Sequence, residues 1–170
     1  NQYFSVMVDI IKKHGGSIDK FMGDAIMALF GATVSYEDNA LRAVTVALEM
    51  CNAVSKLDFS LLKIPDGHVF NIGVGIHYGD VVVGSIGCTD KTDYTVIGDS
   101  VNLASRLEGL TKQYGVRIII SNAVKQDLGN EFFLRHLDNV KVKGKSIAVS
   151  IFSVENSRDL FPDKYLEFYN

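Results

Sequence analysis

The sequence predicts an α+β sandwich, in which helices pack on a mostly antiparallel sheet. Three observations carry this prediction: several segments repeat apolar residues at helical spacing, others alternate apolar and polar residues, and short turns join most of the expected strands. Short turns connect antiparallel strands, whereas parallel strands need long crossovers, so the pattern disfavours a doubly wound sheet. The length of 170 residues suits one domain of ordinary size.

The composition excludes several classes of protein. Hydrophobic residues make up 47% and charged residues 22% of the chain, which is typical of a folded protein. With 17 Lys and Arg against 20 Asp and Glu, the net charge of −3 offers no general attraction to nucleic acid. Cys51 and Cys88 stand alone, the 4 histidines lack zinc-site spacing, and no apolar run is long enough to span a membrane. We therefore expect a soluble, cytoplasmic domain with no nucleic-acid partner.

The chain begins with a predicted helix and hairpin. Apolar residues recur at helical spacing over residues 4–11, and Gly15-Gly16 ends this pattern. Two short apolar runs follow at 18–22 and 25–30, separated by Gly23-Asp24. Since glycine supplies the backbone freedom that a tight turn needs, these runs predict two strands of a hairpin.

A second helix and a second hairpin are expected next. Ser35 precedes two acidic residues in the manner of a helix start, and a buried stripe follows over residues 40–51. Residues 71–78 alternate with a period of two, which predicts a strand. Gly79-Asp80 then predicts a turn into a partner strand at 81–84.

The rest of the chain predicts two helices and four strands. A leucine stripe follows the capping sequence Gly98-Asp99-Ser100, which predicts a helix that Gly115 ends. Short apolar runs predict the strands, and the last two are expected to pair around Gly144. The segments in order are a strand at 93–97, the leucine helix, a strand at 116–120, a helix at 121–128, and strands at 132–142 and 147–154.

Three groups of polar residues are open to a functional and to a structural interpretation. Asp24 at the hairpin tip is either a solvated turn residue or a ligand for a hard cation such as Mg²⁺. Asn102 and Arg106 lie four residues apart and share one helix face, where they can hold a phosphoryl group or merely face solvent. Lysines at 141 and 143 suit the protection of a strand edge, whereas Lys145, just after a glycine, can approach a phosphate.

Several common motifs are absent. Gly73, Gly75 and Gly79 miss the dinucleotide-binding spacing by one residue, and the motif lies on a strand rather than in a strand-to-helix loop. Close packing of a helix is the better explanation for Gly73 and Gly75. The chain has no Walker-type phosphate loop and no recognisable order of nucleophile, base and acid.

Three segments in the right order resemble the catalytic domain of class III adenylate/guanylate cyclases, of the bacterial adenylate cyclase type. Residues 19–31 resemble the metal-binding hairpin of that family, residues 93–108 its catalytic helix segment, and residues 142–145 its late lysine loop. The similarity covers nearly all of residues 1–155, which we take as the catalytic domain, followed by a C-terminal tail at 156–170.

The resemblance implies a ferredoxin-like sandwich that forms a homodimer with active sites across its interface. It implies conversion of ATP to 3′,5′-cyclic AMP and pyrophosphate, assisted by two Mg²⁺ or Mn²⁺ ions, with Asp24 as one of two metal-binding aspartates. Lys20 and Thr95 stand where the family reads the purine, and guanylate cyclases typically carry Glu and Cys there. ATP is therefore the expected substrate.

The remaining site residues also follow from the resemblance. Asn102 is expected to orient the ribose, and Arg106 to stabilise charge on the α-phosphate. Lys145 is expected to hold the terminal phosphates. Lys91 stands where many bacterial relatives have an arginine that contacts the triphosphate.

One departure from the family pattern concerns the start of the chain. The family's opening strand, which carries the other metal aspartate, is expected before Asn1, so we expect the chain as written to have little cyclase activity. An upstream sensor or regulatory domain is expected in the parent protein. Two alternatives remain: a catalytically silent, cyclase-like module for regulation or dimerisation, and a guanylate cyclase.

Overall fold

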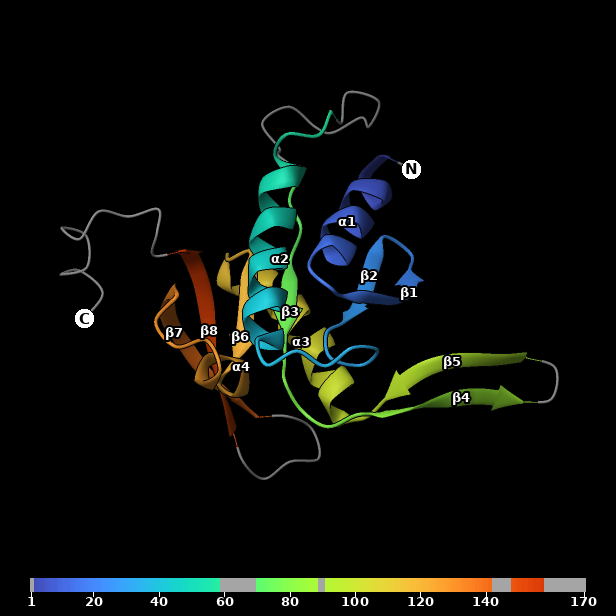
Figure 1. Ribbon diagram of the computed structural model, residues 1–170. Coiled ribbons are helices and arrows are strands. Elements are labelled where there is room, and N and C mark those ends of the chain that lie inside the picture. The colour runs from blue at the N-terminus through green and yellow to red at the C-terminus, as the bar shows by residue number, and fades with distance from the viewer. Residues whose placement is uncertain (1, 59–69, 89–90, 142–147, 158–170) are drawn as a thin grey trace. The chain divides into compact units, whose positions relative to one another are not determined.

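The computed structural model describes residues 2–58, 70–88, 91–141 and 148–157, and its elements are drawn in Figure 1. For residues 86–88, 91–94, 156 and 157 the description is of the backbone alone. The elements in chain order are α1 (Gln2–Lys13), β1 (Ser17–Met22), β2 (Ala25–Leu29), α2 (Asn39–Val54), β3 (Val74–Ile76), β4 (Val82–Cys88), β5 (Lys91–Ile97), α3 (Asp99–Tyr114), β6 (Ile118–Ser121), α4 (Asn122–Gln126), β7 (Phe132–Lys141) and β8 (Ala148–Ser157).

The chain forms two compact units. The first unit comprises residues 1–72 and 80–98, and the second comprises residues 73–79 and 99–170. Four of the five strand pairings in the described residues are antiparallel, and only β3 with β6 is parallel. The predicted α+β class with a mostly antiparallel sheet is therefore confirmed. Among the described helices, none has the length and apolar character needed to cross a membrane.

The first unit contains two hairpins and two helices. β1 pairs with β2 across the turn at Gly23-Asp24, where Gly23 adopts a φ of +64° that favours glycine. β4 pairs with β5 over seven residues of each strand. α1 packs against α2 and β1, and β5 contacts β1, so the two hairpins meet within this unit. Met7 and Ile11 on α1 are fully buried, as the helical spacing of the sequence predicts.

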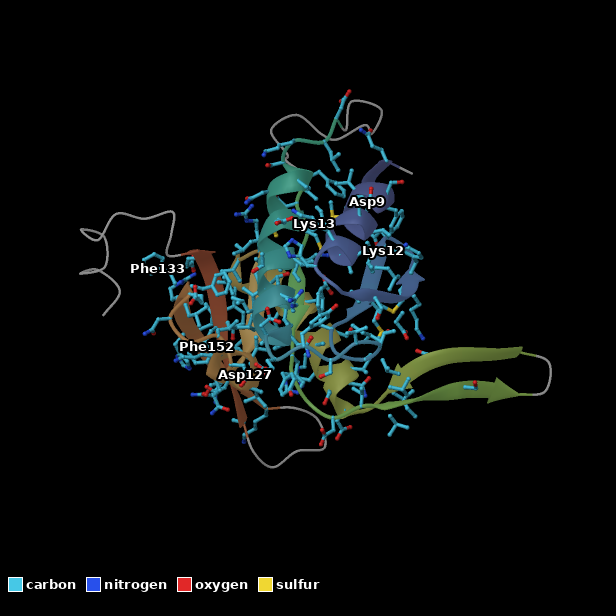
Figure 2. The ribbon with its side chains drawn as sticks, in the orientation of Figure 1. Asp9, Lys12, Lys13, Asp127, Phe133 and Phe152 are labelled. Carbon is cyan, nitrogen blue, oxygen red and sulfur yellow. The ribbon has the colours of Figure 1, made fainter. Side chains whose placement is uncertain are left out.

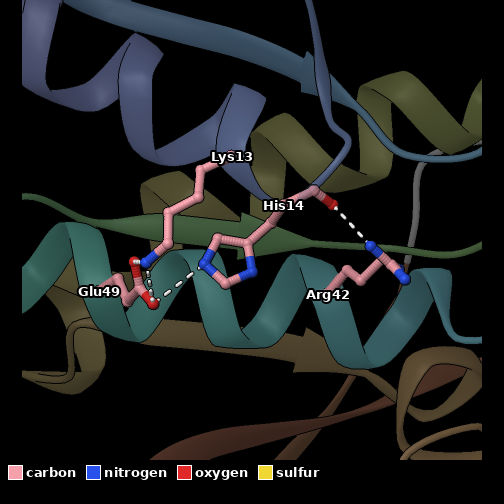
Figure 3. A network of polar contacts seen from close by, with 4 residues as sticks. All are labelled: Lys13, His14, Arg42 and Glu49. Carbon is pink, nitrogen blue, oxygen red and sulfur yellow. Dashed lines mark hydrogen bonds and ion pairs between the residues drawn. The ribbon is translucent and has the colours of Figure 1, made fainter.

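The carboxylate of Glu49 on α2 contacts two side chains at the end of α1 (Figure 3). Its Oε1 lies 2.9 Å from Nε2 of His14, and Lys13 Nζ approaches the same carboxylate at 3.4 Å. Two turns earlier in α2, the Arg42 guanidinium donates a hydrogen bond of 3.3 Å to the backbone oxygen of His14. These contacts satisfy polar groups where α1 ends, and they help to set the angle at which the chain leaves it.

The second unit is a four-stranded sheet in the order β3-β6-β8-β7, with α3 packed on β3 and β6. Its core joins Leu103 and Leu107 of α3 to Ile119 of β6 and Ile151 of β8. The leucines are those of the stripe that predicts this helix. A Cβ atom at Gly75 of β3 would overlap backbone atoms of α3, so the helix lies directly against the strand. The packing explanation for this glycine is therefore confirmed.

The predicted second hairpin is wrong. The strand expected over 71–78 is limited to Val74–Ile76, and it pairs in parallel with β6 rather than with the segment after Gly79-Asp80. The partner expected at 81–84 belongs instead to β4, which pairs with β5. Alternation marks residues that suit a strand, but the hydrogen-bonding neighbour decides how long the strand is, and here β6 has only four residues.

The predicted start of the second helix is also wrong. α2 begins at Asn39, and neither Ser35 nor any other side chain caps it. The carboxylate of Asp38 at the cap position accepts a hydrogen bond of 2.6 Å from Nε of Arg42. Asp38 and Arg42 lie one helical turn apart, and the Asp38 side chain makes this pair instead of a capping hydrogen bond to the backbone.

Tyr114→Phe is expected to make the stability of the second unit less dependent on pH. The Tyr114 hydroxyl donates a hydrogen bond of 2.6 Å to Asp138, which lowers the pKa of Asp138 and raises the pKa of Tyr114. The lowered pKa of Asp138 gives stability above its ordinary value of 3.8 that is lost as pH falls through the folded value. The raised pKa of Tyr114 gives stability below its ordinary value of 10.0 that is lost as pH rises through the folded value.

Urea unfolding at a series of pH values tests this. The difference in free energy of unfolding between wild type and Tyr114→Phe should be constant between pH 3.8 and pH 10.0. It should become smaller below the first value and above the second. Tyr78→Phe is the matched control, because Tyr78 is also in the second unit and is exposed. A difference that does not change with pH below 3.8 or above 10.0 contradicts the prediction.

Candidate functional site

A buried carboxylate joins two of the predicted site residues in the first unit. The Thr95 hydroxyl on β5 donates a hydrogen bond of 2.8 Å to Oδ2 of Asp19 on β1. The Nζ atom of Lys20 lies 3.4 Å from the same oxygen. The Asp19 side chain is only 4% exposed and Thr95 6%, whereas the Lys20 side chain is 41% exposed. The structure thus brings Lys20 and Thr95 together, with the lysine at the edge that faces solvent.

A β-bulge explains how two adjacent residues of β1 approach each other. Ile18 pairs with Ala28 and Lys20 with Met27, so Asp19 is an extra residue without a partner on β2. In a regular strand, neighbouring side chains point to opposite faces, and a bulge changes that direction locally. Asp19 has no predicted role from the sequence, because a bulge leaves no signal in the residue pattern. The only hint is a carboxylate next to a predicted substrate-binding lysine.

Asp24 is exposed in the turn between β1 and β2. Among the described residues, no three His, Cys, Asp or Glu side chains form a metal-binding group. The chemistry of the site still fits a hard cation, since proteins commonly hold Mg²⁺ by one or two carboxylates while phosphate and water supply the other ligands. A single exposed carboxylate such as Asp24 can supply one such ligand.

Asp24 also has an electrostatic effect on its own unit. Burial raises the pKa of Tyr3 on α1, and the negative charge of Asp24 raises it further. The carboxylate and the phenol ring therefore lie close enough to interact. A bound cation at Asp24 would weaken this effect, because its positive charge opposes that of the carboxylate.

Asn102 and Arg106 lie on the exposed side of α3 in the second unit. Leu103 and Leu107 on the same helix are buried, so the prediction that the polar pair shares a face away from the core is confirmed. Within the described part of the chain, no carboxylate forms an ion pair with Arg106. A guanidinium can donate to two phosphate oxygens at once.

Two predicted lysines fall where the side chains are not described. Lys91 begins β5, and its backbone lies opposite Cys88 in the hairpin. Lys145 is outside the described residues. Their roles stay predictions, as do those of Asp24, Asn102 and Arg106.

Several known proteins similar to this chain are named as adenylate or guanylate cyclases. The family model for the adenylate and guanylate cyclase catalytic domain matches residues 1–156. An adenylate cyclase of Anabaena cylindrica is 45% identical over 163 residues, which cover 91% of this chain and 31% of that protein. The chain thus spans less than a third of the length of this relative.

Solved structures agree with the sequence comparisons. The adenylyl cyclase CyaB from P. aeruginosa has a TM-score of 0.78 at 32% identity, covering 95% of this chain and 83% of its own. The guanylyl cyclase Cya2 has a TM-score of 0.76 at 37% identity, covering 94% and 79%. The expected sandwich of the cyclase type is therefore confirmed, by structures of enzymes that are named for two different nucleotides.

Proposed function

Since the chain belongs to the adenylate and guanylate cyclase catalytic domain family, we propose that it is the catalytic domain of an adenylate cyclase, which converts ATP to 3′,5′-cyclic AMP and pyrophosphate. The two solved structures do not choose between ATP and GTP, because CyaB and Cya2 resemble the chain to a similar degree. The observation in the structure that carries the choice of ATP is the cluster of Lys20, Asp19 and Thr95.

The chemistry of this cluster suits adenine. Adenine presents an acceptor at N1 and an amino group at C6, whereas guanine presents a donor at N1 and a carbonyl oxygen at C6. The Lys20 ammonium is only a donor and therefore suits the N1 acceptor. The Thr95 hydroxyl already donates its proton to Asp19, so its free lone pair suits the amino group.

The face of α3 is proposed to act on the sugar and the α-phosphate. Asn102 holds the ribose so that its 3′-hydroxyl points at the α-phosphorus. Arg106 stabilises the negative charge that grows on the α-phosphate oxygens as the ring closes. Lys145, and Lys91 with a single point charge in place of an arginine fork, hold the terminal phosphates.

Asp24 is proposed to hold divalent cations at the same site. When bound, two Mg²⁺ or Mn²⁺ ions lower the pKa of the 3′-hydroxyl and neutralise the leaving pyrophosphate. The carboxylate of Asp24 supplies hard oxygen ligands, and its place in a two-residue turn of a paired hairpin gives it a rigid support.

We place two such sites across a head-to-tail homodimer. Asp24 and Lys20 share one hairpin, and in this arrangement the metal-binding residue of one protomer works with the purine-reading residue of its partner. The catalytic domain is proposed to span residues 1–155, with residues 156–170 as a tail. It is proposed to be cytoplasmic, because its proposed substrate is ATP. Because the Anabaena relative is much longer than this chain, a regulatory or sensor domain is proposed in the parent protein.

The cyclic nucleotide output of the intact natural protein tests this function. The protein is assayed with Mn²⁺, with ATP and GTP in parallel, and cyclic AMP is the expected product. Cyclic GMP as the main product would show a guanylate cyclase. No product from either nucleotide, in a folded dimer, would show a silent regulatory module.

Asp24→Ala is expected to lower the rate of cyclic AMP formation by about 100-fold, since the cations lose a charged ligand. A titration of Mn²⁺ should show a higher half-saturating concentration for the residual activity. Asp127→Ala is the matched control, because Asp127 is another exposed turn aspartate, labelled in Figure 2. If the half-saturating Mn²⁺ concentration of Asp24→Ala equals that of wild type, Asp24 is a solvated turn residue and not a metal ligand.

A further inference from the structure

We propose that Asp19 is the positioning residue that makes the purine-reading pair selective for adenine. It acts through Thr95 and Lys20, and does not itself contact the nucleotide. The inference rests on the proposed function, since it concerns the site that would bind the ATP base. Its basis is the buried contact in which one carboxylate oxygen, Oδ2 of Asp19, serves both residues.

A threonine hydroxyl alone does not discriminate between adenine and guanine. It can donate one hydrogen bond and accept others, so by rotating it satisfies either the amino group of adenine or the carbonyl oxygen of guanine. An ionised carboxylate is only an acceptor. The Thr95 hydroxyl oxygen lies 2.8 Å from Oδ2 of Asp19, so the hydroxyl donates its proton to the carboxylate. Only the lone pairs of its oxygen are then left for a ligand. Asp19 thus converts an ambivalent group into an acceptor that repels the guanine carbonyl.

Burial strengthens this constraint. The Asp19 side chain is 4% exposed and Thr95 6%, so water has little access to compete for either end of their hydrogen bond. Rotating the hydroxyl away would leave a buried carboxylate without one of its donors, which is costly in a protein interior. The polarity of Thr95 is therefore set before any nucleotide arrives.

The same oxygen holds Lys20. Its ammonium is 3.4 Å from Oδ2 of Asp19, while the lysine side chain remains 41% exposed. A lysine has many rotamers, and an ion pair at a fixed buried anion reduces the number that it samples. Its remaining donors are then directed toward the side of the cluster that is open to solvent, where a purine N1 can accept one.

The β-bulge is what makes one carboxylate available to both residues. Asp19 has no partner on β2, whereas Ile18 and Lys20 do. Without the extra residue, the side chains of Asp19 and Lys20 would point to opposite faces of the hairpin. The bulge is therefore part of the arrangement that makes the site selective for adenine over guanine.

A double-mutant cycle in the intact natural protein tests the proposal. The ratio of kcat/KM for ATP to kcat/KM for GTP is measured with Mn²⁺ in wild type, Asp19→Ala, Thr95→Val and the double variant. We expect Asp19→Ala to lower this ratio by about tenfold, mainly through a gain with GTP relative to ATP. In the Thr95→Val background the same change should matter much less, because no hydroxyl is left to orient.

Controls separate this role from a structural one. Asp9→Ala, which removes an exposed charge from α1 (Figure 2), should leave the ratio unchanged. Where Asp19→Ala does not fold, Asp19→Asn keeps the size of the side chain, and its amide can donate to Thr95. The same ratio is also measured as dissociation constants, from displacement of a fluorescent adenine nucleotide by ATP and by GTP, which needs no turnover.

Each outcome is decisive. A wild-type protein that prefers ATP, with an unchanged ratio in the Asp19 variants, overturns the inference and leaves the proposed function standing. An equal decrease in kcat/KM for ATP and for GTP in the Asp19 variants also overturns the inference and leaves the proposed function standing. A residue with a purely structural role would cause such a decrease. A wild-type protein that prefers GTP overturns the proposed function and the inference together.

Discussion

Arg106→Ala is expected to lower kcat for cyclic AMP formation by about 10²–10³, with little change in KM for ATP. The charge that Arg106 is proposed to stabilise appears on the α-phosphate only as the ring closes. An interaction made only in the transition state changes kcat rather than substrate binding. The exposed position on α3, beside the buried Leu107, supports the guanidinium on a rigid helix while leaving it open to a ligand.

Initial-rate kinetics with ATP in the intact protein measures this effect. Arg135→Ala is the matched control: Arg135 is an exposed arginine on β7 that pairs with Glu155 at 3.0 Å, and its loss should leave kcat unchanged. Arg106→Lys should recover only part of the rate, since lysine keeps the charge but not the two-pronged donor geometry. A raised KM with an unchanged kcat in Arg106→Ala would instead assign Arg106 to ground-state binding.

Gly75→Ala is expected to destabilise the second unit by about 3 kcal/mol or to prevent its folding. A Cβ atom at this position would overlap the backbone nitrogen of Glu108 and the carbonyl oxygen of Ala104, and would lie 2.8 Å from the carbonyl carbon of Leu107. All three are backbone atoms of α3, so no side-chain rotation can relieve the overlap. Either β3 or the helix must move away from the other, and the packing of the Leu107 side chain in the core is then lost.

Urea unfolding followed by circular dichroism measures the loss. Gly109→Ala, on the exposed side of the same helix, is the control: a Cβ there meets nothing within 4 Å. It should stabilise the protein by about 0.5–1 kcal/mol, because glycine is a poor residue for a helix interior. A Gly75→Ala variant as stable as wild type would mean that α3 and β3 are not packed as closely as described.

The sequence by itself determined most of the elements and the exposed face of α3 that carries two of the proposed site residues. The leucine stripe and the period of 3.6 residues place Asn102 and Arg106 on the exposed side of α3, and the structure agrees. Gly23-Asp24 likewise marked the first hairpin turn. These predictions succeed because they depend on residues a few positions apart, where periodicity and turn chemistry act directly.

Tertiary structure decided the pairing of the strand before Gly79. The alternating segment before Gly79 looked like one arm of a hairpin, yet β3 pairs with β6, more than thirty positions later in the chain. Pattern shows that a segment can be a strand, but several segments compete for the same edge, and the whole fold chooses among them. The local turn signal at Gly79-Asp80 was too weak to decide that competition.

Tertiary structure also decided the geometry of the proposed purine-reading residues. Lys20 and Thr95 were matched by motif, but the residue that joins them, Asp19, was found only in the folded chain. Its approach to Lys20 depends on a bulge, and its hydrogen bond to Thr95 depends on contact between two distant hairpins. Periodicity cannot report either, since both arise from register and packing between segments that the chain brings together only on folding.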